Sequence, residues 1–391
     1  MSKEKIKLFL DGRKGLLQRL KEALGGESGI IWFHVASLGE FEEARPVIDR
    51  TRERFPEAKI LLTFFSPSGY EPRKNYKAAD WVFYLPLDFP WSVKKFLDIV
   101  RPQKAIFTIG EHWFNLMREL RRRKIDTYIM SVRIEPSSPY LKWYGAPYRN
   151  IFRKNYKCVM VQNEKSLKIF EEMGVPSVVR VGDARVDNVI NVKNENWHNP
   201  IVEAWTRGEK VFVAGSSCPN GDDDIVIALA NAHPEDKFLV IPHEIDSAPI
   251  QRMLSSVLSS ALYSTFEKNG TEGLDKVKFL IVDKVGMLSR LYRYGYAALV
   301  GGGFDIMPHS VVEPAVYGLP IVVGPKFDRE LHVKSLIDLG AATSVSTPEE
   351  AIAWYDRLHS DKEWFESCGK AAESYCMQSS GATEQIMNHI F

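Results

Sequence analysis

The sequence has few cysteines, no long apolar run and almost no net charge. Its four cysteines (Cys158, Cys218, Cys368 and Cys376) show neither a C-x-x-C spacing nor a metal-ligand pattern, which indicates a reducing compartment. The first 24 residues lack the continuous apolar stretch of a signal peptide or membrane span, because charges interrupt it. The formal net charge of +1 gives no argument for nucleic acid as a partner.

The length and composition are those of a folded two-domain protein. A chain of 391 residues is too long for one ordinary core, and 45% hydrophobic with 26% charged residues is typical of globular proteins. No biased tract or internal repeat is visible.

Charge is unevenly distributed along the chain. Residues 101–160 carry 13 Lys and Arg against 4 Asp and Glu, a local charge of +9, which leaves −8 for the rest. The first 24 residues add seven basic against three acidic side chains. This pattern predicts an anionic partner for the N-terminal half, such as phosphate groups or a membrane surface. Solvated helix faces are the alternative, and the leader is equally readable as a plain surface helix or as a short amphipathic segment that lies on a bilayer.

Short apolar runs alternate with helical patterns, which predicts parallel sheets built from βαβ units. A helix is expected over Glu40–Arg54, with Glu42 and Glu43 in its first turn. The Asn-rich segment Asn188–Asn199 is expected to be a linker, residues 264–276 an exposed mobile loop, and the last forty residues helical. Strands are expected near Ile30–Val35, Ile60–Phe64, Trp81–Leu85, Ala105–Ile109, Thr127–Val132 and Cys158–Gln162, then Val211–Gly215, Phe238–Ile241, Phe279–Val282, Ala297–Val300 and Ile321–Val323.

These elements predict two doubly wound α/β domains, residues 1–190 and 200–391. Ligands of such sheets bind at the carboxyl ends of the strands, so two domains that face each other would hold a ligand in the cleft between them.

The segment HVASLGE, His34 to Glu40, places a small turn between a strand and a helix. Gly39 permits a close backbone approach beside Ser37, and the helix start favours an anion. Glu40 is a candidate general base, with an ordinary first-turn glutamate as the structural alternative.

Two further turns follow strands of the first half. Ser66 and Ser68 belong to a hydroxyl-rich turn that suits phosphate or sugar contacts, or that simply caps a helix. Glu111 begins the next helix in TIGEHW, and two glutamates on strand-to-helix turns of one sheet are expected to point into one pocket.

The segment from Val300 to Pro325, VGGGFDIMPHSVVEPAVYGLPIVVGP, carries the most specific pattern. Gly301, Gly302 and Gly303 end a buried strand and let backbone amides approach a phosphate. His309 and Ser310 follow, and Glu313 in the next helix is placed to hold ribose hydroxyls. The glycines do not form G-x-G-x-x-G, so the dinucleotide fingerprint is not met.

In order along the chain, these clusters resemble the motifs of the 3-deoxy-D-manno-octulosonic acid (Kdo) transferases of bacterial lipopolysaccharide synthesis. The resemblance extends from about residue 30 to residue 340. The matching blocks are WFHVASLGE (32–40), SPSG (66–69), LPLD (85–88), GEHWFN (110–115), VGDARVDN (181–188), GSSC (215–218), IPHE (241–244) and MPHSVVEPA (307–315).

This resemblance implies a GT-B fold with two Rossmann-like domains, an N-terminal one for the acceptor and a C-terminal one for the nucleotide sugar. It implies a CMP-Kdo donor, a phosphorylated lipid A precursor as acceptor, and inversion of the anomeric centre without a bound metal or other cofactor. The catalytic residues would be Glu40 and Glu111. The donor would be bound by Ser216, Ser217, Pro242, His243, Gly301, Gly302, Gly303, His309, Ser310 and Glu313.

The acceptor side would use Ser37, Gly39, Ser66, Ser68 and the basic run Arg121, Arg122 and Arg123. The enzyme would act at the cytoplasmic face of the inner membrane, as a peripheral protein or with an anchor outside this chain. Arg45, Arg133 and Arg185 are candidates for the donor carboxylate, and Lys326 for the leaving phosphate.

The chain departs from the family pattern in its donor half. His243 follows Pro242 where the family has P-R-H, Ser310 replaces an Asn, and Cys218 stands at the His of A-S-T-H. Two alternatives remain open: another sugar-nucleotide enzyme, such as a UDP-sugar transferase or 2-epimerase, and a non-enzymatic solute-binding protein.

Overall fold

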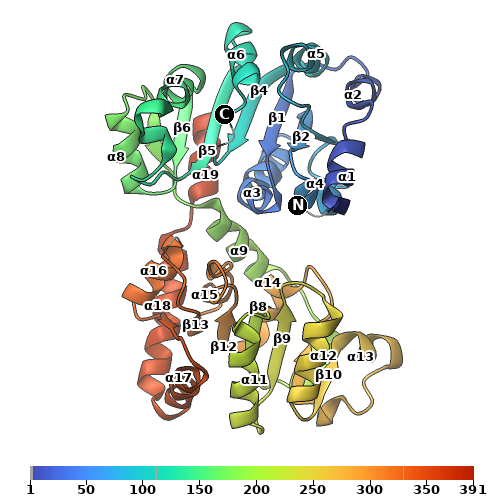
Figure 1. Ribbon diagram of the computed structural model, residues 1–391, viewed down its shortest axis with the longest axis vertical. Coiled ribbons are helices and arrows are strands. Elements are labelled where there is room, and N and C mark those ends of the chain that lie inside the picture. Colours follow the sequence, from blue (N-terminus) through green and yellow to red (C-terminus); the bar gives the residue numbers. More distant parts are fainter. Residues whose placement is uncertain (1–2, 111, 329) are drawn as a thin grey trace. The chain divides into compact units, whose positions relative to one another are not determined.

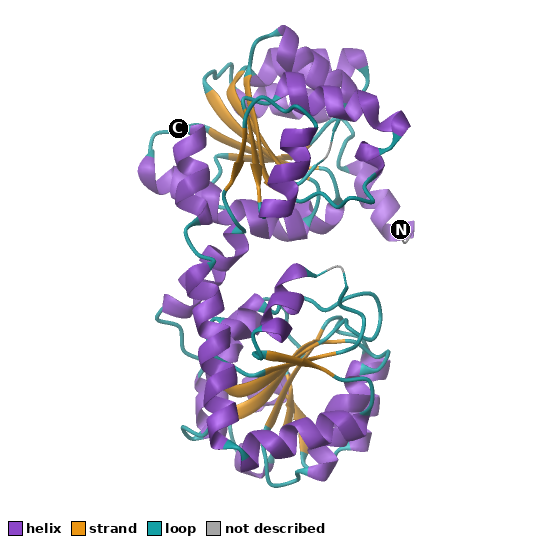
Figure 2. Cartoon of the chain, turned by 90° about the vertical axis from the view of Figure 1, so that its left-hand side faces the viewer, coloured by secondary structure: helices purple, strands orange, loops and turns teal. Residues whose placement is uncertain are grey.

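The computed structural model describes residues 3–110, 112–328 and 330–391, with side chains from Lys5 onward, and divides the chain into two compact units (Figure 1). Unit 1 comprises Met1–Asn188 together with Ser379–Phe391, and unit 2 comprises Val189–Gln378. Each unit is an α/β layer structure in which helices cover both faces of a parallel sheet (Figure 2).

Unit 1 contains a seven-stranded sheet among its described residues, in the order β3-β2-β1-β4-β5-β6-β7. Its strands are β1 (Ile30–Val35), β2 (Ile60–Phe64), β3 (Trp81–Tyr84), β4 (Pro102–Thr108), β5 (Asp126–Val132), β6 (Cys158–Val161) and β7 (Val178–Arg180). Its helices are α1 (Lys3–Asp11), α2 (Leu16–Leu24), α3 (Leu38–Arg54), α4 (Pro67–Arg73), α5 (Pro90–Val100), α6 (Phe114–Arg122), α7 (Ala146–Asn155), α8 (Glu164–Glu172), α9 (Ala184–Asn194) and α19 (Ala382–Ile390), with η1 (Pro139–Leu141) and η2 (Trp143–Gly145).

The alternation of side chains along each strand gives this sheet two apolar faces. Trp32 and Phe107 pack on one face with helices that include α2 and α5, and Phe33 and Met130 pack on the other with α3 and α19. A parallel sheet buried on both faces requires such continuous apolar strands.

Unit 2 repeats this plan in the order β10-β11-β9-β8-β12-β13-β14. Its strands are β8 (Val211–Ser217), β9 (Phe238–Pro242), β10 (Ser260–Leu262), β11 (Phe279–Ile281), β12 (Gly295–Val300), β13 (Ile321–Val323) and β14 (Ala342–Ser344). Its helices are α10 (Pro200–Thr206), α11 (Asp222–Ala232), α12 (Ser247–Ser256), α13 (Tyr263–Asn269), α14 (Leu288–Leu291), α15 (Val312–Ala315), α16 (Leu331–Asp338), α17 (Pro348–Ser360) and α18 (Lys362–Gln378), with η3 (Leu274–Lys276) and η4 (Tyr292–Tyr294).

The strands expected from the sequence are confirmed, and the structure adds the short β7, β10 and β14. Two expectations were wrong. The Asn-rich segment is largely helical, because α9 continues to Asn194. Residues 263–269 of the expected loop form α13, since Tyr263 and Phe266 are buried against unit 2.

The chain returns to unit 1 at its end, which differs from the expected boundary of 200–391. Ile386, Met387 and Ile390 of α19 pack on the unit 1 sheet. Asp187 fixes the start of α19, because its carboxylate accepts hydrogen bonds from the amides of Gly381 at 2.7 Å and Thr383 at 2.6 Å.

Candidate active site

Glu40 lies in the first turn of α3, directly beyond the carboxyl end of β1. Ser37 is the N-cap of this helix, and its hydroxyl accepts from the Glu40 amide at 3.5 Å. The Glu40 carboxylate in turn accepts from the Ala36 amide at 2.6 Å. This exchange closely resembles a capping box, so the candidate base also has a structural role.

Glu43 is the feature of this helix that the sequence did not reveal. It was expected in a solvated first turn, but only 5% of it is exposed. Its Oε1 lies 3.6 Å from Arg185 Nε, and the Gln162 amide donates to its Oε2 at 3.3 Å. Burial, then the nearby Asp183 carboxylate, raises the pKa of Glu43 to about 8 despite the opposing effect of Arg185.

Arg185 is shared by two acids. Its Nε and Nη2 donate to Asp183 Oδ2 at 3.0 and 2.7 Å, and Asp183 is buried. Glu40 also raises the pKa of Glu43, so the cluster Glu40–Glu43–Asp183–Arg185 is one electrostatic unit at the carboxyl edge of the sheet. The clue in the sequence was the VGDARVDN block itself, whose Asp183 was not singled out.

The serine turn is a helix cap. Ser66 is the N-cap of α4 and accepts from the Ser68 amide at 3.3 Å, and the two hydroxyls lie 2.9 Å apart. Gly69 is required here, since a Cβ would lie 2.4 Å from the Phe64 ring. The exposed Ser68 is the accessible hydroxyl of the turn.

The remaining unit 1 predictions fall on either side of the described region. Glu111 lies outside the described residues. Arg122 and Arg123 pair with Glu119 at 2.9 and 3.4 Å, and Arg123 also pairs with Asp98 at 2.8 Å, so these cations are partly engaged within the unit. Arg121 is exposed.

In unit 2 the three glycines form the loop after β12, and close packing explains their small size. A Cβ on Gly301 would lie 2.2 Å from the Ser216 carbonyl oxygen, and one on Gly303 would lie 2.7 Å from the Gly324 amide nitrogen. Gly302 has a φ of 96°, which favours glycine. The loop is therefore packed against the neighbouring strand ends.

Asp222 organises this loop and was not predicted from the sequence. It is fully buried, and its Oδ2 accepts from the amides of Gly302 at 2.7 Å and Cys218 at 3.1 Å. Burial raises the pKa of Asp222 to about 6, although both amide bonds oppose the shift. This carboxylate ties the β8 and β12 loops together.

The predicted donor-binding residues His243 and His309 meet beside these loops. Their rings stack with centroids 4.2 Å apart, and Cys218 Sγ lies 4.0 Å from His309 Nε2. Burial and the neighbouring His243 lower the pKa of His309 to about 4, so His309 is a neutral imidazole at neutral pH. Pro242 ends β9 immediately before this pair.

Four further donor-side predictions have definite places. Ser216 adopts a φ of 54° at the end of β8, and Ser217 beside it is buried. Ser310 lies between His309 and α15, and Glu313 on α15 accepts from the Ser289 hydroxyl at 2.9 Å. The structure thus gathers these residues at the carboxyl edge of the sheet.

Lys326 has a structural role in the same loop. Its ammonium donates to the carbonyl oxygens of Phe304 at 2.8 Å and Asp305 at 2.9 Å. These bonds fix the segment that follows the glycines, so two of its three donors are directed to backbone.

Comparison with known proteins agrees with this arrangement. Residues 11–188 match the family described as 3-deoxy-D-manno-octulosonic-acid transferase (kdotransferase). A 3-deoxy-D-manno-octulosonic acid transferase of Aquifex aeolicus is 26% identical, over 88% of this chain and 90% of the relative. One of Haemophilus influenzae is 24% identical, over 92% and 86% respectively.

The solved structures that resemble this one share its fold. The UDP-GlcNAc 2-epimerase of Neisseria meningitidis, bound to UDP-GlcNAc, superposes with a TM-score of 0.66 and 14% identity over 92% of this chain and 98% of the other. A putative UDP-N-acetylglucosamine 2-epimerase from Listeria monocytogenes gives 0.62 and 12%, over 92% and 95%.

The fold and these relatives together define a glycosyltransferase of the GT-B class. Within that class, the chain belongs to the Kdo transferase family. No helix in the described part of the chain is long and apolar enough to cross a membrane.

Proposed function

We propose that the chain transfers Kdo from CMP-Kdo to a hydroxyl of a phosphorylated lipid A precursor, with inversion at the anomeric carbon. The observation that carries this proposal is the agreement between its relatives and its strand ends. Relatives named Kdo transferases match about nine-tenths of the chain. The motifs that resemble the family's stand at the carboxyl ends of strands in both sheets, where α/β enzymes bind their ligands.

Glu40 is the proposed general base. It would remove the proton of the acceptor hydroxyl as that oxygen attacks the anomeric carbon and CMP leaves. Its bond from the Ala36 amide fixes the carboxylate at the end of β1, which supports a defined orientation for proton transfer. The buried cluster of Glu43, Asp183 and Arg185 supplies the electrostatic environment of this base.

Of the three arginines considered for the sugar carboxylate, Arg185 is favoured. It belongs to the cluster that includes Glu40, and 26% of its side chain is exposed. Arg45 pairs instead with Glu42 and Asp49 on another face of α3. An arginine fork suits a planar carboxylate.

The proposed donor contacts lie in unit 2. The glycine loop would bring backbone amides to the phosphate, and the Glu313 carboxylate would accept from ribose hydroxyls. Because Asp222 and Lys326 fix the loop through its backbone, few groups need to reorganise as charge develops on the leaving phosphate.

The acceptor is proposed to bind unit 1 from an anionic membrane surface, at the cytoplasmic face of the inner membrane. Exposed apolar side chains lie on α1 and at the start of α5, including Leu10 (56%) and Trp91 (68%). Between α2 and α5 lies an apolar hollow of about 310 Å³, lined by Leu16, Leu87 and Phe89, which suits an acyl chain.

The test is direct. The protein is incubated with CMP-Kdo and the tetraacylated lipid A precursor, and the product mass is measured with UDP-N-acetylglucosamine as the control donor. The proposal expects a product heavier than the acceptor by one or more Kdo residues and no product with the UDP sugar. Turnover of the UDP sugar with CMP-Kdo inert would contradict it.

A further inference from the structure

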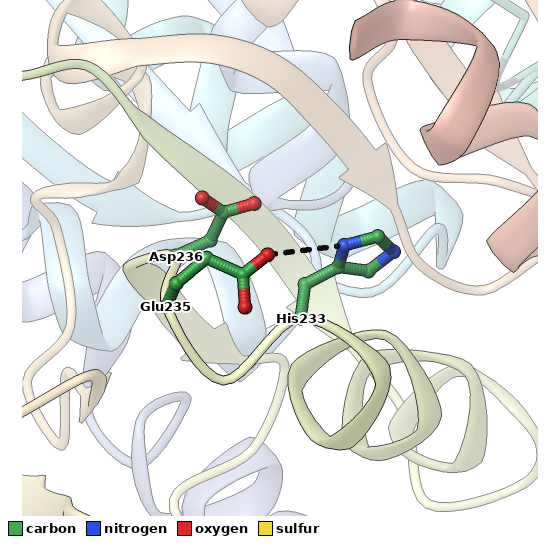
Figure 3. Close-up of side chains that lie close together, drawn as sticks. All are labelled: His233, Glu235 and Asp236. Atoms are coloured by element: carbon green, nitrogen blue, oxygen red, sulfur yellow. Dashed lines mark ion pairs between the residues drawn. The ribbon is translucent and has the colours of Figure 1, made fainter. Parts of the chain in front are cut away.

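A second group of ligand-type side chains lies in unit 2, at the turn between α11 and β9. His233 ends α11, and Glu235 and Asp236 follow it immediately before β9 begins (Figure 3). This turn is at the amino edge of the parallel sheet, whereas the glycine loop and the His243–His309 pair follow the carboxyl ends of strands. The two groups are therefore at opposite edges of one sheet.

The spacing of these three residues fits one ion. A nitrogen of His233 and one carboxylate oxygen from each acid all lie within 4.8 Å of one another. His233 Nδ1 is 3.7 Å from Glu235 Oε1. Two ligands of a tetrahedral Zn²⁺, each about 2.0–2.1 Å from the metal, are separated by about 3.3–3.4 Å. A shift of a few tenths of an ångström would bring this pair to coordination distance.

The imidazole of His233 is not satisfied within the protein. Its Nε2 is buried and makes no hydrogen bond to any described residue, although Asp356 Oδ1 lies 3.2 Å away. Only 14% of the side chain is exposed. A buried polar atom without a partner calls for a missing ligand or ion.

The residues around the group are arranged as an outer shell. Asp356 on α17 faces Nε2 of His233, which would orient the ring with Nδ1 toward the two acids. The Tyr355 hydroxyl donates to Asp236 Oδ2 at 2.9 Å. Ligating histidines and carboxylates in metal sites commonly have such partners, which fix the tautomer and the orientation.

Charge also favours a cation here. Glu235, Asp236 and Asp356 are three carboxylates in a small volume, and in the described part of the chain none forms an ion pair with a lysine or arginine. The second imidazole, His359, lies with its Nε2 3.5 Å from Asp236 Oδ2 and its ring stacked 6.0 Å from that of His233. It is close enough to serve as a further ligand.

We propose that His233, Glu235 and Asp236 bind a divalent transition-metal ion, with Zn²⁺ as the best chemical match. Imidazole and carboxylate donors suit Zn²⁺. The ion would join the end of α11 to the start of β9 and, through Asp356, to α17. Its role is structural, because it lies at the amino edge of the sheet, away from the loops proposed to bind the donor.

The experiment is calorimetric titration of ZnCl₂ into the full chain after removal of metal by a chelator, with a phosphine reductant to keep the cysteines reduced. Two variants remove ligands, His233→Gln and Glu235→Gln. The second is safe for folding because the Glu235 side chain is 69% exposed. Asp356→Asn tests the outer shell, and His198→Gln, from an exposed His–Glu pair in the same unit, is the matched control.

The expected result is one saturable zinc site in the wild type and in His198→Gln that is lost in both ligand variants. In Asp356→Asn the affinity should fall about 10- to 100-fold, the usual effect of removing an outer-shell partner. Absence of saturable binding in the wild type would overturn the proposal. Equal binding in the wild type and in both ligand variants would overturn it as well, because the zinc would then be bound elsewhere.

Discussion

Arg185 Nε lies 3.6 Å from Glu43 Oε1 and 3.0 Å from Asp183 Oδ2, so one guanidinium serves two buried carboxylates. A single positive charge cannot fully compensate both acids in a desolvated setting. The outcome is that Asp183 takes the bidentate contact, while burial and the Asp183 charge keep Glu43 protonated up to about pH 8. The sheet edge beside the proposed base therefore stores a proton at neutral pH.

This proton makes the stability of unit 1 depend on pH. The pKa of Glu43 is about 8 in the folded chain against a model value of 4.5, so between these values the folded state holds a proton that the unfolded state has lost. Stability should then fall as pH rises through this window, by about 1.4 kcal/mol per pH unit for one proton. Glu43→Gln should remove this dependence and be the more stable protein at pH 8. Urea unfolding at pH 5, 6.5 and 8 measures it.

Glu42→Gln is the matched control for this series. Glu42 is the next residue on α3, but its carboxylate pairs with Arg45 and Arg73. That variant should keep the wild-type dependence on pH. A Glu43→Gln protein that loses stability with pH as steeply as the wild type would show that Glu43 is already ionised when folded.

The proposed base gives a kinetic prediction. Glu40→Gln should lower turnover about 10²- to 10⁴-fold, because it removes a positioned base, while folding and CMP affinity stay unchanged. The glutamine carbonyl can still accept from the Ala36 amide, so the cap is retained. Glu40→Ala should in addition lose about 1 kcal/mol of stability with that cap. Single-turnover transfer assays and thermal unfolding separate the two effects, and near-normal transfer by the glutamine variant would reject the assignment.

The sequence predicted most of the fold because its signal is local. Apolar runs such as Ile60–Phe64 can be buried only as strands, and their spacing identifies βαβ units. The ends of the chain were harder. The amphipathic pattern of α19 indicates a helix but not its partner, and it packs on unit 1 because Asp187, almost 200 residues earlier, caps it.

The candidate site was predicted only where a local pattern carried the chemistry. Ser37, Gly302 and Glu313 stand in recognisable turns. Glu43 and Asp222 do not, because an acid in the first turn of a helix is usually solvated and complements the helix dipole. Their burial depends on partners 80 to 142 residues away, Gly302 for Asp222 and Arg185 for Glu43.

Asp222 allows a test of the glycine loop that separates charge from hydrogen bonding. Asp222→Asn can still accept from the Gly302 and Cys218 amides through its side-chain oxygen. Because the pKa of Asp222 is about 6 when folded against 3.8, the charged form costs stability above that window, and the asparagine variant should be at least as stable at pH 7. Asp222→Ala should lose about 1–3 kcal/mol and weaken CMP binding. Equal CMP affinity and stability in both variants would show that the carboxylate does not organise the loop.

The donor site is tested at Glu313. Glu313→Ala should weaken CMP by about 1–3 kcal/mol through lost charged hydrogen bonds to the ribose. Ser289→Ala is the control, since its hydroxyl donates to Glu313 Oε2 at 2.9 Å without being a proposed ligand contact. Calorimetry should find a smaller effect for Ser289→Ala. Unchanged CMP affinity in a folded Glu313→Ala protein would place the nucleotide elsewhere.

The basic surface of unit 1 gives the last prediction. The structure distinguishes the three arginines at the end of α6, because Arg123 is held by Asp98 and Glu119 while the Arg122 side chain stays 60% exposed. Arg121 is exposed too. Two cations are therefore accessible to an anionic surface, and the third mainly holds α6 against α5.

Converting Arg121, Arg122 and Arg123 to Ser should reduce binding to anionic vesicles about 10- to 100-fold at low salt, since each cation near such a surface contributes about 1 kcal/mol. High salt should weaken wild-type binding, neutral vesicles should not bind, and CMP affinity should not change. Lys334, Lys362 and Lys370 of unit 2, changed to Ser, remove the same charge from the other unit and should leave vesicle binding intact. Co-sedimentation decides: equal loss in both triple variants would indicate only a net-charge effect, and equal binding to anionic and neutral vesicles would contradict an electrostatic surface on unit 1.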